Sequence, residues 1–165
     1  MLSNRIYRVI VILLIIVMNI GCDQVSKKMV RERVAENETV ELLKNHFILT
    51  RVENSGAFLS LGDSLSKSGK NILLSALPLI ALVFAAVYVF SKHDISTLSL
   101  LSICFIIGGG IGNIFDRMVH GSVTDFFYIH YGFFQTGVFN MADLSITTGA
   151  IIILLQSVLK RKNLQ

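Results

Sequence analysis

The chain has 165 residues, of which 53% are hydrophobic and 16% charged, with a formal net charge of +4 and a mean hydropathy of +0.66. A soluble globular domain typically carries roughly 25% charged residues, so this composition disfavours that class. The positive excess is too small and too dispersed to indicate nucleic-acid binding, and basic residues beside a bilayer commonly act as lipid-surface anchors. We therefore expect a single integral membrane domain over residues 1–165.

The cysteines and histidines give no sign of a metal site or of a disulfide framework. Cys22 and Cys104 both lie in or beside apolar segments, and the chain contains no C-x-x-C pair. The four histidines lack the spacing that metal ligands usually show. The sequence therefore predicts neither a metal ion nor another cofactor.

Four stretches are apolar, nearly free of charge and about long enough to cross a bilayer as helices. We expect these crossings at roughly residues 6–22, 71–91, 95–116 and 139–159. Pro78 is expected to kink the second crossing, because proline cannot complete the helical hydrogen-bond pattern. The GGGIG run at 108–112 would let the third helix approach a neighbour closely.

The first apolar segment also imitates a bacterial lipoprotein signal peptide. Arg5 and Arg8 precede an apolar core that ends at Gly21-Cys22. In this alternative Cys22 would carry lipid and the first helix would be lost. However, Asn19 stands three residues before the cysteine, where such signals usually have Leu, and three further crossings make a lipid anchor redundant. We expect the helix to remain, with Cys22 as an unmodified packing residue at the membrane edge.

Four crossings place both termini on one side of the membrane and regions 23–70 and 118–137 on the other. Residues 23–33 are expected to continue the first helix beyond the bilayer. A small sheet on the membrane surface is predicted from short strand-like runs at 40–43, 47–52 and 57–61. The second region is rich in aromatic residues, which suits the lipid headgroup layer, whereas the Lys and Arg counts leave the orientation ambiguous.

Polar residues gather at the ends of the apolar segments on this second side. Asp23 and Lys27 are one helical turn apart, so they can form an ion pair. Asn113 and Asp116 are three residues apart and share a face at the end of the third crossing. A hydrogen-bonded structural network explains these two pairs at least as well as chemistry does.

Asp125 and Asp143 are stronger candidates for chemistry. Asp143 opens the fourth crossing and shares a helix face with Asn140, while Asp125 precedes two phenylalanines and has no basic neighbour in sequence. Carboxylates are costly to keep beside apolar segments, and two that lie close together can share one proton and activate water. Two alternatives remain, namely a small proton-coupled transporter that uses membrane carboxylates, and a non-catalytic scaffold.

Five motifs resemble, in chain order, those of bacterial lipoprotein signal peptidase, also called signal peptidase II. They are DQVSK (23–27), ENSGAF (53–58), GGGIGNIFDR (108–117), GSVTDFF (121–127) and FNMADLSI (139–146). Each motif alone is weak, but five in the right order across all four crossings are highly specific.

The resemblance implies an aspartic endopeptidase of the bacterial inner membrane, with its active site on the periplasmic or extracellular face and its termini inside. Such an enzyme removes signal peptides from diacylglyceryl-modified prolipoproteins by cleaving before the lipidated cysteine. Asp125 and Asp143 match the catalytic positions. The matching substrate-binding or supporting positions are Asp23, Lys27, Asn54, Gly56, Asn113, Asp116, Arg117 and Asn140. The implied partners are prolipoproteins, membrane lipids and globomycin-type inhibitors but no nucleic acid, and a monomer is expected.

Together these observations predict a membrane α-helical fold. Four transmembrane helices carry a small extracytoplasmic β-sheet and a loop or helix on the periplasmic side. Asn54 is expected to help hold the substrate peptide in extended form, and Asn140 to orient the two catalytic aspartates. Arg117 is expected either to contact lipid or polar backbone, or to pair with Asp116 or another acid.

Overall fold

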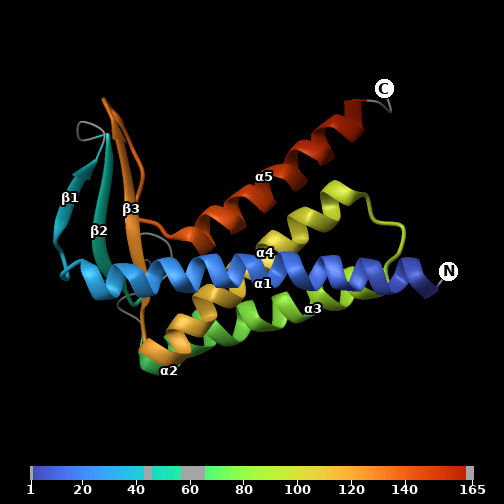
Figure 1. The fold of residues 1–165 in the computed structure, drawn as a ribbon, viewed down its shortest axis with the longest axis horizontal. Helices are drawn as coiled ribbons and strands as arrows, with labels where there is room; N and C mark the ends of the chain where they lie inside the picture. Colours follow the sequence, from blue (N-terminus) through green and yellow to red (C-terminus); the bar gives the residue numbers. More distant parts are fainter. Residues whose placement is uncertain (1, 43–45, 57–65, 163–165) are drawn as a thin grey trace.

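The computed structural model describes residues 2–42, 46–56 and 66–162. Long helices run together and carry a small sheet at one end, and both termini lie at the opposite end (Figure 1). Four helical segments are long and apolar enough to cross a membrane, namely Arg5–Arg33, Ser68–Ser91, Thr97–His120 and Met141–Lys160. The predicted class of four crossings and a small sheet is thus confirmed.

The first helix, α1, extends well past the apolar segment. It spans Leu2–Arg33 without interruption, and its 32 residues correspond to about 48 Å at 1.5 Å per residue. A hydrocarbon core is only about 30 Å thick, so the last turns project beyond it, as expected for residues 23–33. Cys22 lies inside this continuous helix with an exposed side chain, so it is not packed against other parts of the protein.

The second crossing is irregular near its start. It consists of the short helix α2 (Lys67–Asn71), a π-helical turn η2 (Ile72–Ala76) and helix α3 (Leu77–Ser91). Pro78 lies at the start of α3, where its ring and missing N–H disturb the preceding turn. The irregularity predicted for this proline is therefore a π-helical turn on its N-terminal side.

Helix α4 (Thr97–His120) is the central helix and packs tightly through its glycines. A Cβ on Gly108 would lie 2.6 Å from Cβ of Asn19, and one on Gly112 would lie 2.5 Å from Oδ2 of Asp23. Only glycine permits this approach of α1, which confirms the close packing predicted for the GGGIG run. The last helix, α5 (Met141–Lys162), packs along α4 as far as Gln156, which accepts from Ser96 and Ser99, and it diverges from α1 and α3 towards its end (Figure 1).

The sheet has four antiparallel strands in the order β1-β2-β3-β4. Its strands are β1 (Thr39–Leu42), β2 (Phe47–Asn54), β3 (Val123–Tyr131) and β4 (Phe134–Gln135). The runs predicted at 40–43 and 47–52 form β1 and β2, apart from residue 43, which lies outside the described residues together with the run at 57–61. Strands β3 and β4 were not predicted, because the aromatic content of 118–137 was interpreted only as a headgroup signal.

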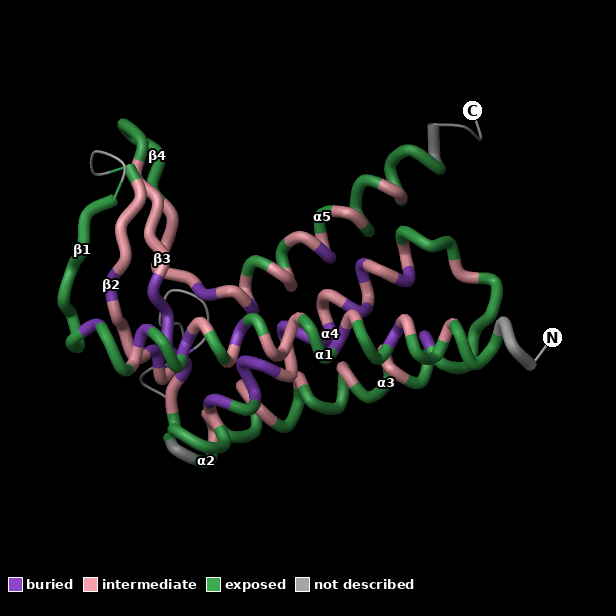
Figure 2. The backbone as a smooth tube through the Cα atoms, viewed as in Figure 1, coloured by how far each residue is buried: buried purple, intermediate pink, exposed green. Residues whose placement is uncertain are grey.

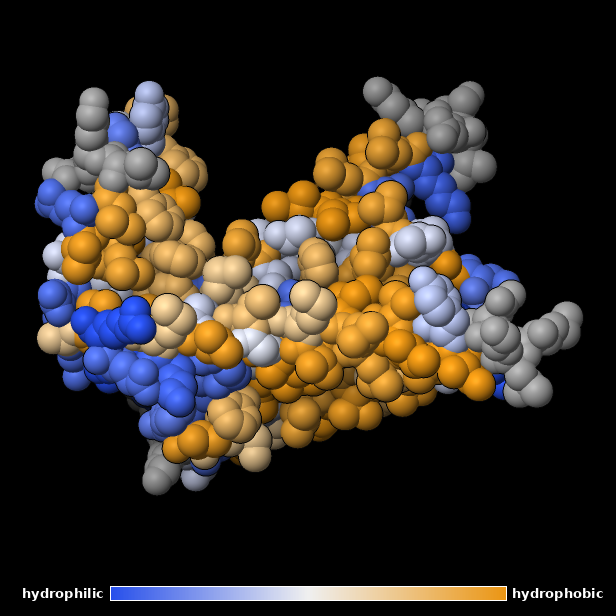
Figure 3. Space-filling view, viewed as in Figure 1, coloured by the Kyte–Doolittle hydropathy of each residue, from blue (hydrophilic) through white to orange (hydrophobic). Residues whose placement is uncertain are grey.

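Burial concentrates where α4 meets its neighbours and where the sheet meets the helix ends (Figure 2). One apolar core lies within the bundle and includes Ile12, Val89 and Cys104. A smaller one joins Val30 and Val34 of α1 to Phe126 of β3. The outer helix surfaces stay apolar, whereas hydrophilic residues gather near the sheet end (Figure 3). This distribution suits helices that face lipid and a polar site at one membrane surface.

Candidate active site

Asp125 lies in β3, opposite Val52 of β2, and is only 4% exposed. The side-chain amide of Asn54 donates to its Oδ2 at 2.9 Å, and that of Asn140 donates to its Oδ1 at 2.6 Å. Burial raises the pKa of Asp125 to about 6; the Asn54 hydrogen bond opposes this rise, and the charge of Asp143 adds to it. Asp125 is therefore a carboxyl group that can hold a proton near neutral pH.

Asp143 is placed by the hydrogen bonds that begin α5. Asn140 precedes the helix, and its Oδ1 accepts from the backbone N–H of Asp143 at 3.0 Å, while Oδ2 of Asp143 accepts from the backbone N–H of Asn140 at 3.1 Å. This reciprocal pair has the form of a capping box, which satisfies two N–H groups that the helix itself cannot. The spacing of three residues seen in the sequence is thus the spacing of a helix cap.

Amide groups are the described hydrogen-bond donors to both carboxyl groups. The side chains of Asn54 and Asn140 serve the two oxygens of Asp125, while Asn113 donates to Oδ1 of Asp143 at 2.8 Å and the Asn140 backbone serves the other oxygen. Neither carboxyl group forms an ion pair with any residue that the structure describes. Each oxygen retains a second acceptor position, so the pair can still bind water or substrate.

A separate cluster of charges lies next to this pair and is almost closed to solvent. Nζ of Lys27 lies 2.8 Å from a carboxylate oxygen of Asp23 and equally far from one of Asp116. Arg31 binds the other oxygen of Asp116 at 2.9 Å. The Asp23–Lys27 pair expected from their spacing is confirmed, and its burial indicates a structural function. Oδ1 of Asp23 also accepts from the N–H of Ala142, which attaches α1 to the first turn of α5.

Asn113 joins the charge cluster to the carboxyl pair. Lys27 donates to Oδ1 of Asn113 at 2.9 Å, and the amide nitrogen of Asn113 donates to Asp143. An ammonium group can only donate hydrogen bonds, so it holds the Asn113 oxygen towards itself and the nitrogen towards Asp143. Lys27 therefore fixes the direction in which the Asn113 amide points, although it does not touch either candidate catalytic acid.

Arg117 contacts backbone, one of the alternatives left open by the sequence. Its guanidinium group donates to the carbonyl oxygen of Gly56 at 2.9 Å and to that of Asn113 at 3.4 Å. Asn54 accepts from the N–H of the same Gly56 at 3.0 Å. The pairing of Arg117 with Asp116 does not occur, because Lys27 and Arg31 occupy that carboxylate. Gly56 is thus held from both sides at the edge of the site.

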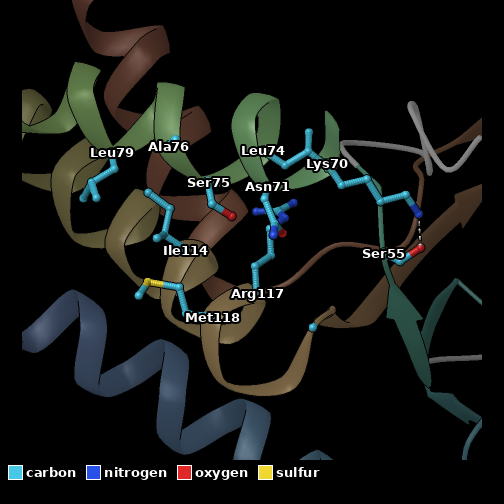
Figure 4. Close-up of a pocket in the computed structure, with 11 residues that line it drawn as sticks. Ser55, Lys70, Asn71, Leu74, Ser75, Ala76, Leu79, Ile114, Arg117 and Met118 are labelled. Carbon is cyan, nitrogen blue, oxygen red and sulfur yellow. Dashed lines mark hydrogen bonds between the residues drawn. The ribbon is translucent and has the colours of Figure 1, made fainter. Parts of the chain in front are cut away.

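A cavity of about 580 Å³ opens between the start of the second crossing and the end of α4 (Figure 4). Arg117 lines it, as do apolar side chains including Leu74 and Met118, and Lys70 donates to Ser55 at 2.9 Å along its rim. The lining includes neither Asp125 nor Asp143. The cavity therefore borders the carboxyl pair through Arg117 and does not contain it.

Arg31 and Thr124 also belong to this site and were not predicted from the sequence. Arg31 donates to Oγ1 of Thr124 at 2.7 Å in addition to its ion pair with Asp116, so it attaches α1 to β3 directly beside Asp125. The signal was available, since Asp23, Lys27 and Arg31 repeat every four residues and therefore share one face of α1. Which acid would meet that face could not be read from the spacing.

Comparison with known proteins agrees with this geometry. The family model described as "Signal peptidase (SPase) II" matches residues 14–159. The lipoprotein signal peptidase of Clostridium acetobutylicum is 33% identical over 149 residues, which cover 90% of this chain and 94% of the relative. That of Streptococcus pneumoniae is 30% identical over 145 residues, which cover 88% of this chain and 90% of the relative.

Solved structures share the fold. One described as a bacterial membrane enzyme superposes with a TM-score of 0.83 at 24% identity, over 94% of this chain and 92% of that one. A second with the same description gives a TM-score of 0.75 at 26% identity, over 88% and 91%. With a family model that spans nearly the whole chain, relatives aligned over most of their length and four helices able to cross a membrane, this multi-pass bacterial membrane protein belongs to the signal peptidase II family.

Proposed function

We propose that this signal peptidase cleaves prolipoproteins as an aspartic endopeptidase, with Asp125 and Asp143 as its catalytic pair. The observation that carries the proposal is the meeting of two acids from β3 and α5 at one asparagine, Asn140, with amide donors on every oxygen and no described cation as partner. The family supports peptidase activity and gives no support to the transporter or scaffold alternatives.

The chemistry follows from one proton shared by two acids. Ionising both together is unfavourable, so one carboxyl stays neutral while the other is charged. Because burial raises the pKa of Asp125, we assign it the role of proton donor and Asp143 that of general base. Asp143 removes a proton from water as the water oxygen bonds to the scissile carbonyl carbon, and Asp125 gives its proton to the carbonyl oxygen. When the C–N bond breaks, the leaving amine takes the proton that Asp143 acquired, and one hydroxyl of the intermediate returns its proton to Asp125 as the new carboxyl group forms, which restores the starting pair.

The surrounding residues position this pair. Asn140 orients both acids, as expected, and Asn113 is set by Lys27 to donate to Asp143. Asn54 binds Asp125, so we assign it a positioning role in place of the peptide-holding role expected from the sequence. Because all of these side chains come from one chain, residues 1–165 are proposed to act as one peptidase domain and as a monomer.

The location of the pair suits a substrate that carries acyl chains. Asp125 lies in β3 and Asp143 in the first turn of α5, at the end of the bundle where the sheet meets the helices (Figure 1). Acyl chains of a diacylglyceryl cysteine can remain in the bilayer while the peptide bond before it lies at headgroup depth. We place the enzyme in the inner membrane with this site on the periplasmic or extracellular face, as the family resemblance implies.

The test is cleavage by the purified chain in detergent. The substrate is a diacylglyceryl prolipoprotein, and the same prolipoprotein without its lipid is the control. We expect cleavage immediately before the lipidated cysteine, inhibition by globomycin, and no inhibition by EDTA or by serine- or thiol-directed reagents. Inhibition by EDTA that added metal reverses would contradict the two-aspartate mechanism, and equal cleavage of both substrates would contradict the proposed specificity.

A further inference from the structure

The hairpin of β3 and β4 ends in a tight, ordered turn. Tyr131 pairs with Phe134, which leaves Gly132 and Phe133 as a two-residue connection. Gly132 has a φ of +59°, a conformation in which glycine is favoured at the first central position of a type II′ turn. The hydroxyl of Tyr128 donates to the side chain of Gln135 at 3.0 Å and fastens the two strands below the turn.

This turn presents three aromatic side chains away from the protein. Phe133 is 103% exposed, Tyr131 68% and Phe134 58%. We call these three residues the aromatic tip. A cluster of exposed aromatic side chains on an ordered hairpin indicates a contact surface, and aromatic residues are enriched where a protein meets lipid headgroups.

The position of the hairpin identifies what it contacts. The strands run across the direction of the helices, so the hairpin extends sideways from the end of the bundle (Figure 1). A notch separates the sheet from α5, and its walls are largely apolar (Figure 3). The α5 surface is exposed at Leu144, Ile151 and Leu154 and belongs to a crossing helix, so it faces lipid. The notch therefore opens onto lipid, and the sheet side of the notch lies over the same bilayer.

We propose that the aromatic tip inserts into the headgroup region of the bilayer beside the bundle, as a membrane contact separate from the four crossings. Residues 128–136 contain no Asp, Glu, Lys or Arg, so the contact does not depend on anionic lipid. Together with the helix ends, the tip holds the sheet that carries Asp125 at a fixed depth relative to the lipid.

The chain contains no tryptophan, so one introduced tryptophan is a unique reporter. Phe133→Trp is placed in the full chain and reconstituted into phosphatidylcholine vesicles whose acyl chains carry bromine near the headgroup. Phe84→Trp, on the lipid-facing side of α3 and 71% exposed, is the membrane control. Glu32→Trp is the water control, because Glu32 is exposed in the part of α1 that projects beyond the bilayer.

We expect bromine to quench Phe133→Trp at least half as strongly as Phe84→Trp, with the same result when anionic lipid is added, and Glu32→Trp to be nearly unaffected. Phe134→Trp gives an independent second reporter if the first variant does not fold. Quenching no greater than that of Glu32→Trp would overturn the proposal. A blue-shifted emission without quenching would overturn it as well, since it would indicate that another protein copy covers the tip. Neither readout depends on peptidase activity.

Discussion

Two groups of buried acids lie side by side in this molecule, and they differ in whether basic side chains neutralise them. Asp23 and Asp116 are matched by Lys27 and Arg31 at 2.8–2.9 Å, so this charge cluster is electrically balanced. Asp125 and Asp143 receive only amide hydrogen bonds from described residues. Charges paired in this way exchange protons less readily, and they stabilise the packing of the helices. An acid pair without a cation keeps one proton available for reaction.

The largest expected effect is the loss of turnover when either unpaired acid is replaced. Asp125→Asn and Asp143→Asn preserve the size of each side chain but remove its ionisable proton, so each should lower turnover by roughly 10²–10⁴-fold or more. The double variant should be scarcely slower than either single one, because residues that act as a unit are not additive. The measurement is cleavage of a diacylglyceryl prolipoprotein, with a melting curve for each variant. Substantial turnover in either single variant would remove that acid from the mechanism.

A substitution in the charge cluster should lower the stability of the fold. Lys27→Met leaves Asp23 without a cation and Asp116 with Arg31 alone; removal of one partner of a buried pair typically costs about 3–5 kcal/mol. Activity should fall too, because the Asn113 amide is then free to turn. Lys28→Met is the matched control on the same helix, since Lys28 forms an exposed pair with Glu32 at 3.9 Å. Such surface pairs contribute about 0–1 kcal/mol, so this control should melt like wild type.

The same contrast applies to the acids of the cluster. Asp23→Ala and Asp116→Ala should each lower the melting temperature in detergent together with activity, because each leaves two cations, Lys27 and Arg31, with only one acid in the cluster. A variant that melts like wild type and yet is wholly inactive would show that its residue takes part in the reaction, which would erase the distinction between the two groups.

A smaller effect is expected in the pH dependence of stability. The folded-state pKa of Asp125 is raised from 3.8 to about 6, so its stabilising contribution is fully present below pH 3.8 and is lost as pH rises through 6. At 1.36 kcal/mol per pKa unit the loss is about 3 kcal/mol. The melting temperature of wild type should therefore fall more between pH 4 and 8 than that of Asp125→Asn. An equal fall in melting temperature with pH for the two proteins would contradict the raised pKa of Asp125.

The smallest effect is predicted for Cys22. Its side chain is exposed on a continuous helix, and none of the described hydrogen bonds or ion pairs of the two groups of acids involves it, so Cys22→Ala should leave turnover and melting temperature close to wild type. Intact-mass analysis should show an unmodified chain that still includes α1. A diacylglyceryl mass on Cys22, or an N-terminus that begins there, would instead support the signal-peptide alternative.

Spacing along the sequence predicted contacts within an element much better than contacts between elements. The crossings followed from apolar length, and the Asp23–Lys27 pair followed from the helical repeat. The contact of Asn54 with Asp125 joins residues 71 positions apart on neighbouring strands, so no local pattern could reveal it. Resemblance to a known family selected polar residues that the fold brings close together, but it did not predict which hydrogen bonds each one makes.

The strands β3 and β4 could not be predicted from the sequence for a different reason. Their aromatic residues fit a headgroup segment and a β-strand equally well, because both environments favour side chains that are partly apolar and partly polar. Only the pairing with β2 distinguishes the two, and that pairing depends on where the ends of α1 and α4 bring the chain.

The hydrogen bond from Ala142 to Asp23 has a consequence for how the protein is made. It joins the first and last crossings, and the capping residues Asn140 and Asp143 lie at the same helix start. A nascent chain with three crossings in the bilayer therefore lacks one acid of the proposed catalytic pair and the asparagine that contacts both. Under the proposed mechanism, the protease is inert throughout its own insertion and becomes competent only when the final helix docks.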